Sequence, residues 1–251
     1  MNKPLLVIDS GVGGLTTLAK IRKKMPNINI IYFADDTFLP YGNKTEQQLI
    51  LHICDIITEF EDEICGVVLA CNTATGVAIS ALRKMFCFPI IGTEPAVMLA
   101  CKTEGKTAVL VTPLEARQDK FLKLIQGKNV VVKEMKNLAR IIDDCLLSWV
   151  DFGVLQKELT DCICGLKDAI KANGVKKIVL GCTHYVFLRY TNLLLGFELF
   201  DGNEGVSDRV CALLRDEGNS KITIAFASGN KKKSQMALRL LNEIMLFDFC
   251  P

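Results

Sequence analysis

Short runs of consecutive apolar residues alternate along the chain with longer segments in which apolar residues recur every three or four positions. An uninterrupted apolar run is typical of a strand buried on both faces, and the longer spacing is typical of a helix with one apolar side. The expected strands lie at 5–9, 29–35, 66–70, within 88–97, and at 107–112, 129–135, 176–181, 197–202 and 221–228. The expected helices lie at 15–25, 45–63, 74–86, 114–125, 136–172 with a break near 151–153, 204–216 and 231–246. This alternation predicts an α/β fold with mainly parallel sheets flanked by helices.

Part of this pattern occurs twice. The segment "GVVLACNTA" (66–74) resembles "KIVLGCTHY" (177–185), and "LLVIDSG" (5–11) corresponds in position to "AVLVTPL" (108–114). Parallel α/β sheets bind ligands at the carboxyl ends of their strands. Two similar halves facing each other would therefore enclose a shared cleft with one thiol on each wall.

Composition narrows the class of protein. The chain has 251 residues, half of them hydrophobic, with 30 basic and 28 acidic residues, so its charge gives no reason to expect nucleic acid or an anionic membrane as partner. The apolar runs are too short to span a membrane, and no signal peptide is recognisable, so we expect a soluble, cytoplasmic protein. The 11 cysteines include no C-x-x-C pair, which argues against a zinc ribbon or a thioredoxin-type centre.

A glycine-rich turn, "GVGGLT" (11–16), follows the first expected strand and precedes a helix. It resembles the dinucleotide fingerprint G-x-G-x-x-G, and Asp35 and Asp36 end the second strand near the position of a ribose contact, but Thr16 stands where the third glycine belongs. The alternative is a turn that feeds a helix N-terminus, which attracts carboxylates as readily as phosphates. A nicotinamide-dependent oxidoreductase stays open as a hypothesis at this point.

The two cysteines at strand ends indicate proton-transfer chemistry. Asn72 and Thr73 follow Cys71 as donors suited to a carboxylate, and Thr183 and His184 follow Cys182. A free thiol has a pKa of about 8.5, so it can act as acid or base with modest tuning. Thiols on opposite walls suit the inversion of a stereocentre, and His184 and Asp9 could assist them. We interpret the other histidine, His52, as structural or surface-exposed.

Taken together, five motifs resemble those of the cofactor-independent amino-acid racemases of the aspartate/glutamate racemase superfamily, the glutamate racemases in particular. They occur in the order of the family and cover the chain nearly end to end: "DSGVGGL" (9–15), "PYG" (40–42), "ACNTA" (70–74), "EPA" (94–96) and "GCTHY" (181–185).

The resemblance implies two pseudo-symmetric α/β domains, expected at 1–94 plus 205–251 and at 95–204, with the active site in the cleft between them. It implies that Cys71 and Cys182 are the catalytic acid and base, assisted by Asp9 and His184. The residues that would hold the substrate are Ser10, Pro40, Tyr41, Gly42, Asn72, Thr73 and Thr183. It further implies an amino-acid substrate, a homodimer, no pyridoxal phosphate, no metal, and D-glutamate as a product for bacterial peptidoglycan.

Three positions depart from the family pattern. Glu115 occupies the place of a second threonine after Thr112, Val186 replaces the proline that usually follows "CTHY", and Gly202 replaces a serine. The family's acidic residue of the second half is expected at Asp143. A carboxylate at Glu115 would repel an acidic substrate unless it is protonated or points away. Aspartate or another amino acid therefore remains an alternative substrate, and a catalytically silent regulator remains an alternative function.

Overall fold

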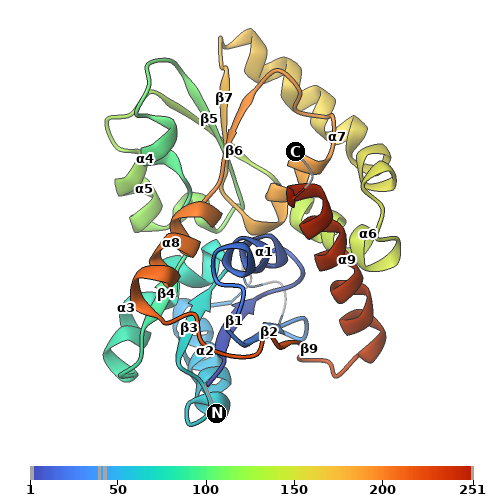
Figure 1. Cartoon of the computed structure of the whole chain (residues 1–251). Helices are drawn as coiled ribbons and strands as arrows, with labels where there is room; N and C mark the ends of the chain where they lie inside the picture. Colours follow the sequence, from blue (N-terminus) through green and yellow to red (C-terminus); the bar gives the residue numbers. More distant parts are fainter. Residues whose placement is uncertain (1–2, 39–40, 42–43, 250–251) are drawn as a thin grey trace.

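The computed structural model describes residues 3–38, 41 and 44–249 and contains two parallel β-sheets (Figure 1). Within these residues the first sheet has the strand order β4-β3-β1-β2-β9 and the second the order β6-β5-β7-β8. The strands of the first sheet are β1 (Leu5–Asp9), β2 (Ile30–Ala34), β3 (Gly66–Leu69), β4 (Ile90–Gly92) and β9 (Ile222–Phe226). Those of the second are β5 (Thr107–Val111), β6 (Val130–Glu134), β7 (Lys177–Leu180) and β8 (Glu198–Phe200). All the described strand pairs are parallel, as the uninterrupted apolar runs predicted.

The two sheets repeat one arrangement. When β5 to β8 are matched with β1 to β4, the order β4-β3-β1-β2 becomes β8-β7-β5-β6, and β9 is an addition at one edge of the first sheet. The central strands β1 and β5 are fully buried, and β3 and β7 flank them in the same sense. The internal repeat of the sequence is therefore a repeat of structure. Cys71 and Cys182 occupy equivalent places, beyond the ends of β3 and β7.

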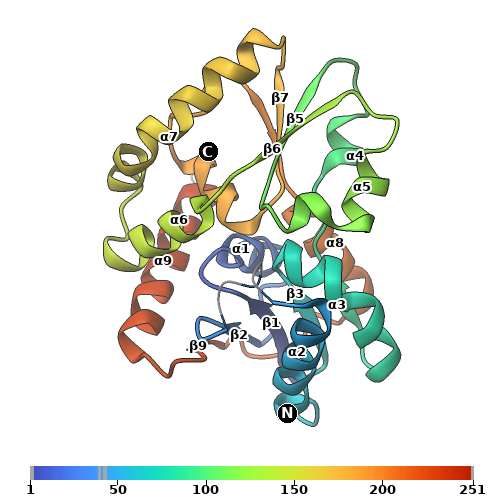
Figure 2. The same ribbon diagram turned by 180° about the vertical axis from the view of Figure 1, so that it is seen from behind.

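Helices cover the faces of both sheets (Figures 1 and 2). The α-helices are α1 (Leu15–Lys24), α2 (Glu46–Phe60), α3 (Asn72–Met85), α4 (Val97–Ala100), α5 (Asp119–Ile125), α6 (Leu138–Ser148), α7 (Phe152–Ala172), α8 (Asn203–Leu213) and α9 (Lys231–Phe249). The helix expected over 136–172 is divided at Trp149–Asp151, as the sequence indicated, because Asp151 caps α7 by accepting from the backbone N–H groups of Gly153 and Val154.

Three segments differ from the expectation, one of them the short helix α4, which none of the expected helices covers. The helix expected over 114–125 is split at Gln118 into a short 3-10 turn, η2 (Glu115–Arg117), and α5. The residues after Cys182 form a 3-10 helix, η3 (Thr183–Tyr190), that no helical pattern predicted because seven of its eight residues are buried and no polar side marks it.

The two sheets meet through helices as well as through strand ends. Helix α1 packs against α8, α9 and η3, and α9 packs against β9 and α6, so the end of the chain contacts both halves. Figure 1 shows α1 between the lower, first sheet and the upper, second sheet. The domain limits expected near residues 94 and 204 stay predictions. Over the described residues, no helix is long and apolar enough to cross a membrane.

Candidate active site

Cys71 and Cys182 lie where the carboxyl ends of the two sheets face each other. Cys71 is the N-cap of α3 directly after β3, and Cys182 is the N-cap of η3 directly after β7. Both cysteines are almost closed to solvent, with 8% of each residue exposed, and neither thiol forms a disulfide. The two are near enough for the charge of Cys182 to raise the pKa of Cys71. The sequence expectation of one thiol from each half is therefore matched by their placement.

The surroundings of Cys71 favour the protonated thiol. Burial raises its pKa far above the ordinary value, and the negative charge of Asp9 raises it further. Hydrogen bonds from the backbone N–H of Ala74 and from the hydroxyl of Ser10 act in the opposite direction. Because burial is the larger effect, the protonated thiol of Cys71 is favoured in this arrangement.

Asp9 ends β1 and connects the two halves. It is fully buried, and its carboxylate accepts the backbone N–H of Gly11 at 2.9 Å and the hydroxyl of Thr183 at 3.1 Å. Burial raises the pKa of Asp9, whereas the positive charge of His184 lowers it. A carboxyl of this kind can hold or release a proton beside the thiols.

His184 is buried between Cys182 and an acidic residue of α6. Its Nδ1 lies 4.0 Å from Cys182 Sγ, and its Nε2 lies 3.0 Å from Asp143 Oδ1. Burial lowers the pKa of His184, but the hydrogen bonds to Asp143 and Cys182 and their negative charges outweigh it, so the pKa lies well above the ordinary 6.5. The ring is therefore an imidazolium, which places positive charge beside Cys182.

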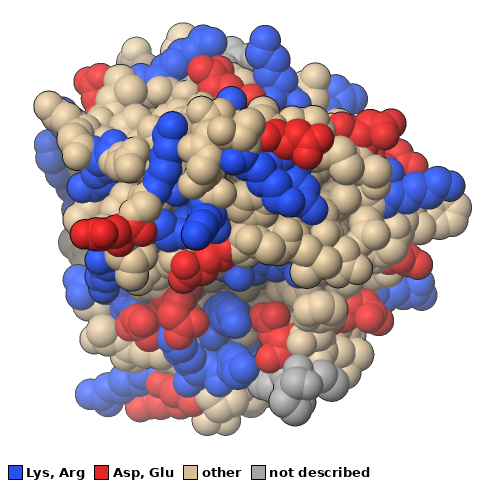
Figure 3. Space-filling view, turned by 90° about the horizontal axis from the view of Figure 1, so that it is seen from above, with Lys and Arg blue, Asp and Glu red and all other residues tan. Residues whose placement is uncertain are grey.

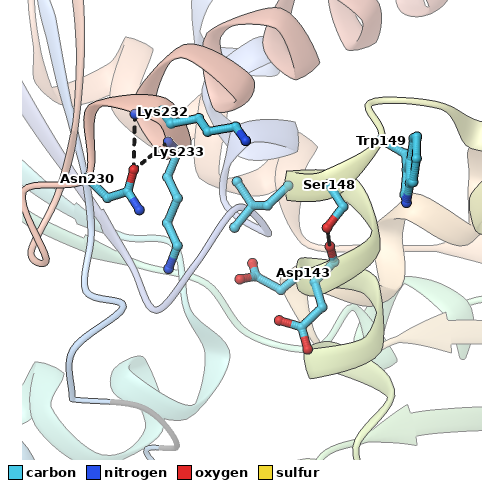
Figure 4. A pocket seen from close by; sticks show the side chains of 8 residues that line it. Asp143, Ser148, Trp149, Asn230, Lys232 and Lys233 are labelled. Carbon is cyan, nitrogen blue, oxygen red and sulfur yellow. Dashed lines mark hydrogen bonds between the residues drawn. The ribbon is translucent and has the colours of Figure 1, made fainter.

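Asp143 is a residue whose importance the sequence showed only weakly. It lies 41 residues before His184 in a segment without a clear motif, and it also accepts the backbone N–H of Val12 at 2.8 Å. A pocket of about 530 Å³ lies behind it between α6 and the start of α9 (Figure 4). In this view the carboxylate of Asp143 lies across the pocket from Asn230 and Lys233. Asp143 thus ties α6, the glycine-rich turn and His184 together.

The glycine-rich turn is explained by close contact between the two halves. A Cβ added to Gly13 would lie 2.5 Å from Thr183 Oγ1 and 2.6 Å from His184 Nδ1, and one added to Gly11 would lie 2.3 Å from Asp143 Oδ1. No side chain larger than hydrogen fits at these distances. The glycines therefore let the second half approach β1, which accounts for them without a bound dinucleotide.

The residues expected to hold substrate gather around the same strand ends, as far as the structure describes them. Ser10, Asn72, Thr73 and Thr183 are between 3% and 8% exposed. Thr73 Oγ1 lies 3.4 Å from Thr112 Oγ1, across the boundary between the sheets. Tyr41 is buried on the side of the first sheet, and Pro40 and Gly42 lie outside the described residues.

Basic and acidic side chains are interspersed on the face that Figure 3 presents. In the described part of the chain, no group of three or more histidine, cysteine or acidic residues could hold a metal ion. The titratable groups that the structure brings together around the two strand ends are the thiols of Cys71 and Cys182, the carboxyls of Asp9 and Asp143 and the ring of His184.

Comparison with protein families decides the class of this molecule. Residues 19–204 match the family model described as Asp/Glu/Hydantoin racemase. The chain belongs to this family. The racemase is 32% identical to a glutamate racemase of Bifidobacterium longum, over 95% of this chain and 98% of that one. It is 31% identical to a glutamate racemase of Clostridium botulinum, over 96% and 97% of the two chains.

Solved structures agree on the fold of this racemase. A glutamate racemase from Thermus thermophilus, in complex with β-chloro-D-alanine, is 26% identical over 97% of this chain and 94% of that chain, with a TM-score of 0.72. The Escherichia coli glutamate racemase, in complex with L-glutamate and the activator UDP-MurNAc-ala, superimposes with a TM-score of 0.80 at 24% identity, covering 96% and 95% of the chains. The protein is therefore an isomerase with the two-domain racemase fold.

One of the departures from the family pattern, Gly202, has a structural explanation in this racemase. A Cβ on Gly202 would lie 2.7 Å from Thr93 Oγ1 and 2.8 Å from the carbonyl oxygen of Glu94, so the backbone there leaves no room for serine. Val186 is buried in η3 as part of the main hydrophobic cluster. Both departures therefore concern packing near the site.

Glu115 is the departure with chemical consequences. Its carboxyl is buried, its Oε2 has no hydrogen-bond partner among the described residues, and burial raises its pKa to about 7. Its backbone N–H donates to Thr112 Oγ1 at 3.2 Å, and the residue lines a cavity of about 450 Å³ together with Asn72. Near neutral pH a large fraction of Glu115 is uncharged, which reduces its repulsion of an acidic substrate.

Proposed function

We propose that this racemase interconverts L- and D-glutamate without a cofactor, by proton transfer between Cys71, Cys182 and the α-carbon of the substrate. The observation that carries the proposal is the pair of buried free thiols, one after β3 and one after the equivalent strand β7. The name shared by the curated relatives supports glutamate as the substrate.

The reaction needs one sulfur on each face of the α-carbon. One cysteine, as thiolate, takes the α-proton, and the electron pair of the broken C–H bond stays on the carbon. The other cysteine, as thiol, gives its S–H proton to the opposite face and becomes the thiolate. Atoms and electrons balance without an oxidant, and the reverse direction uses the same groups with their roles exchanged.

The surroundings of each thiol suit these roles. On the Cys71 side burial and the charge of Asp9 favour the thiol, which donates a proton. On the Cys182 side the imidazolium of His184, held by Asp143, places positive charge beside the sulfur that takes the α-proton. To reset the pair for a second turnover in the same direction, Cys71 must regain a proton and Cys182 must lose one, and Asp9 and His184 are the titratable groups beside the two sulfurs.

The α-proton of an amino acid is only weakly acidic, so the site must stabilise negative charge that develops on the substrate. Preorganised donors in a water-excluded site do this most effectively. The candidates are the hydroxyl of Ser10, the amide of Asn72, the hydroxyl of Thr73 and the first-turn N–H groups of α3. A substrate with two carboxylates would use donors from both halves, which include Thr183.

The cellular role follows from the product. D-Glutamate would serve peptidoglycan synthesis, and we expect the enzyme to act in the cytoplasm as a homodimer, with domains at 1–94 plus 205–251 and at 95–204. Gel filtration with light scattering would test the dimer, and limited proteolysis near residues 94 and 204 would test the domain limits.

A single assay tests the activity. Purified protein is incubated with L-glutamate in D₂O without added cofactor, and the D-enantiomer is followed by chiral chromatography together with deuterium at the α-carbon. Racemisation should incorporate solvent deuterium, and Cys71→Ser and Cys182→Ser should each lower kcat by a factor on the order of 10³ or more. Cys65→Ser, at the opposite end of β3, is the control and should keep its activity.

Other outcomes would point elsewhere. Full activity in either serine variant would remove the two-thiol mechanism. Turnover of L-aspartate in place of L-glutamate would make the enzyme an aspartate racemase, which the departure at Glu115 keeps as a second candidate. Tight binding of a nicotinamide nucleotide would favour an oxidoreductase.

A further inference from the structure

A buried carboxylate beyond the thiols is held by two donors. Asp35 directly follows β2, is fully buried, and donates its backbone N–H to the carbonyl oxygen of Asp9 at 2.8 Å. Its Oδ2 accepts the hydroxyl of Tyr41 at 2.7 Å, and the same oxygen lies 2.7 Å from Nε2 of His52 on α2. Asp35 thus joins the strand that carries Asp9 to the "PYG" segment and to a helix on the outside of the sheet.

The ring of His52 is itself fixed in place. It stacks on Phe38 with the ring centroids 3.8 Å apart and the planes at 16°, and Lys44 Nζ lies 4.4 Å from the centre of the Phe38 ring. Phe38 also contacts Tyr41 edge to face at 6.3 Å. These contacts give His52 a structural role at the outside of the first sheet. The ring of His52 thus contacts Phe38 and Asp35, and both of these residues contact Tyr41.

Tyr41 connects this cluster to the reaction centre. It is 4% exposed and belongs to the same buried cluster as Cys71. Burial raises the pKa of Tyr41 well above its ordinary value, and the charge of Asp35 raises it further. A tyrosine hydroxyl has one proton. Because that proton is donated to Asp35, the Tyr41 hydroxyl cannot donate to a substrate at the same time.

We propose that His52 is a positioning residue of this enzyme, acting through Asp35 to hold Tyr41 beside Cys71. A buried carboxylate needs donors, and the two strong ones here are Tyr41 and His52. Removal of His52 leaves Asp35 with an unfilled acceptor position, which is met by water or by movement of Tyr41. Either response loosens the hold on Tyr41 but leaves the two thiols untouched.

The proposal rests on the proposed function, and its test separates the two. In the racemisation assay, His52→Ala should raise the KM for L-glutamate about five- to tenfold, because part of the free energy of one charge-assisted hydrogen bond is lost from substrate binding. The kcat of the variant should stay within about twofold of the wild-type value. His52→Gln, which keeps an N–H donor, should recover part of the loss. Glu59→Ala, at an exposed position of the same helix, is the matched control.

A double-mutant cycle tests the route through Tyr41. If His52 acts through Asp35 and Tyr41, then His52→Ala should add little to the KM of Tyr41→Phe, because the hydroxyl it positions is already absent. Calorimetric binding of D-glutamate to the same variants gives a readout that does not depend on turnover. Thermal unfolding of each variant confirms that it is folded.

Each outcome has a distinct meaning. Failure of the wild-type protein to racemise glutamate overturns the proposed function. Racemisation with unchanged KM and unchanged binding in His52→Ala overturns the role of His52. An equal loss in the wild-type and Tyr41→Phe backgrounds overturns the route through Tyr41.

Discussion

The buried carboxyl of Glu115 should make the enzyme less stable as the pH rises. Glu115 is 4% exposed, and burial together with the negative charge of Glu94 raises its pKa from an ordinary 4.5 to about 7, against the opposing charge of Lys120. The folded protein therefore binds this proton more tightly than the unfolded chain. The stabilisation is complete below pH 4.5 and is lost as the pH rises to about 7.

The magnitude follows from the difference between the two pKa values. At about 1.4 kcal/mol for each pKa unit, ionisation of Glu115 removes about 3 kcal/mol of unfolding free energy, of which about 2 kcal/mol falls between roughly pH 5.5 and pH 8.5. Glu115→Gln keeps the shape of the side chain and removes the titration. Compared with the wild type, the variant should gain about 2 kcal/mol in stability over that pH interval.

Urea unfolding at a series of pH values measures this difference, because the midpoint and slope give the unfolding free energy at each pH. Glu134→Gln, at the exposed end of β6, is the control and should shift the curve little. If the curves of wild type and Glu115→Gln run parallel from pH 5.5 to pH 8.5, Glu115 does not titrate as its burial implies.

Two further predictions concern the contact between the halves. Asp143→Asn keeps the shape of the side chain but removes the charge beside His184, so the pKa of His184 should fall. The kcat should drop by a factor on the order of a hundred. Because the chain has two histidines, NMR titration of the ring protons measures the pKa of His184 directly. In the wild type the raised pKa means that the His184–Asp143 pair stabilises the fold fully below about 6.5, and that this contribution is lost as the pH rises through the higher folded value. Gly13→Ala places a methyl group 2.5 Å from Thr183 Oγ1. Thermal unfolding should show a loss of about 1–3 kcal/mol in unfolding free energy, together with reduced activity. An unchanged melting temperature would mean that the two halves can move apart at this contact without a loss of stability.

The elements of this fold could be predicted because their signals are local. The apolar run at 5–9 is β1, and Thr45 is the N-cap of α2, with a capping box to Gln48. The strand ends that carry Cys71 and Cys182 were visible because the same sequence pattern precedes both. The 3-10 helix η3 was missed, since burial on all sides removes the periodicity by which a helix is recognised.

The partners of the site residues could not be predicted, because they are brought together from distant parts of the chain. Asp143 and Val12 are separated by 131 positions, and no local pattern relates them. The raised pKa of Glu115 depends on its burial in the folded protein. His52 contacts Asp35 because α2 packs beside the end of β2. Each of these is a property of packing.

The sequence by itself determined the alternating strands and helices, the repeat of the two halves, the glycine-rich turn and the two thiols at strand ends. It could do so because hydrophobic periodicity and turn chemistry act over a few residues. The tertiary structure alone decided which charges face the thiols and that Asp143 holds His184. It also decided that Glu115 is buried, which raises the pKa of its carboxyl to about 7. Ionisation depends on burial and on charges within a few ångströms, and those neighbours exist only once the two sheets have met.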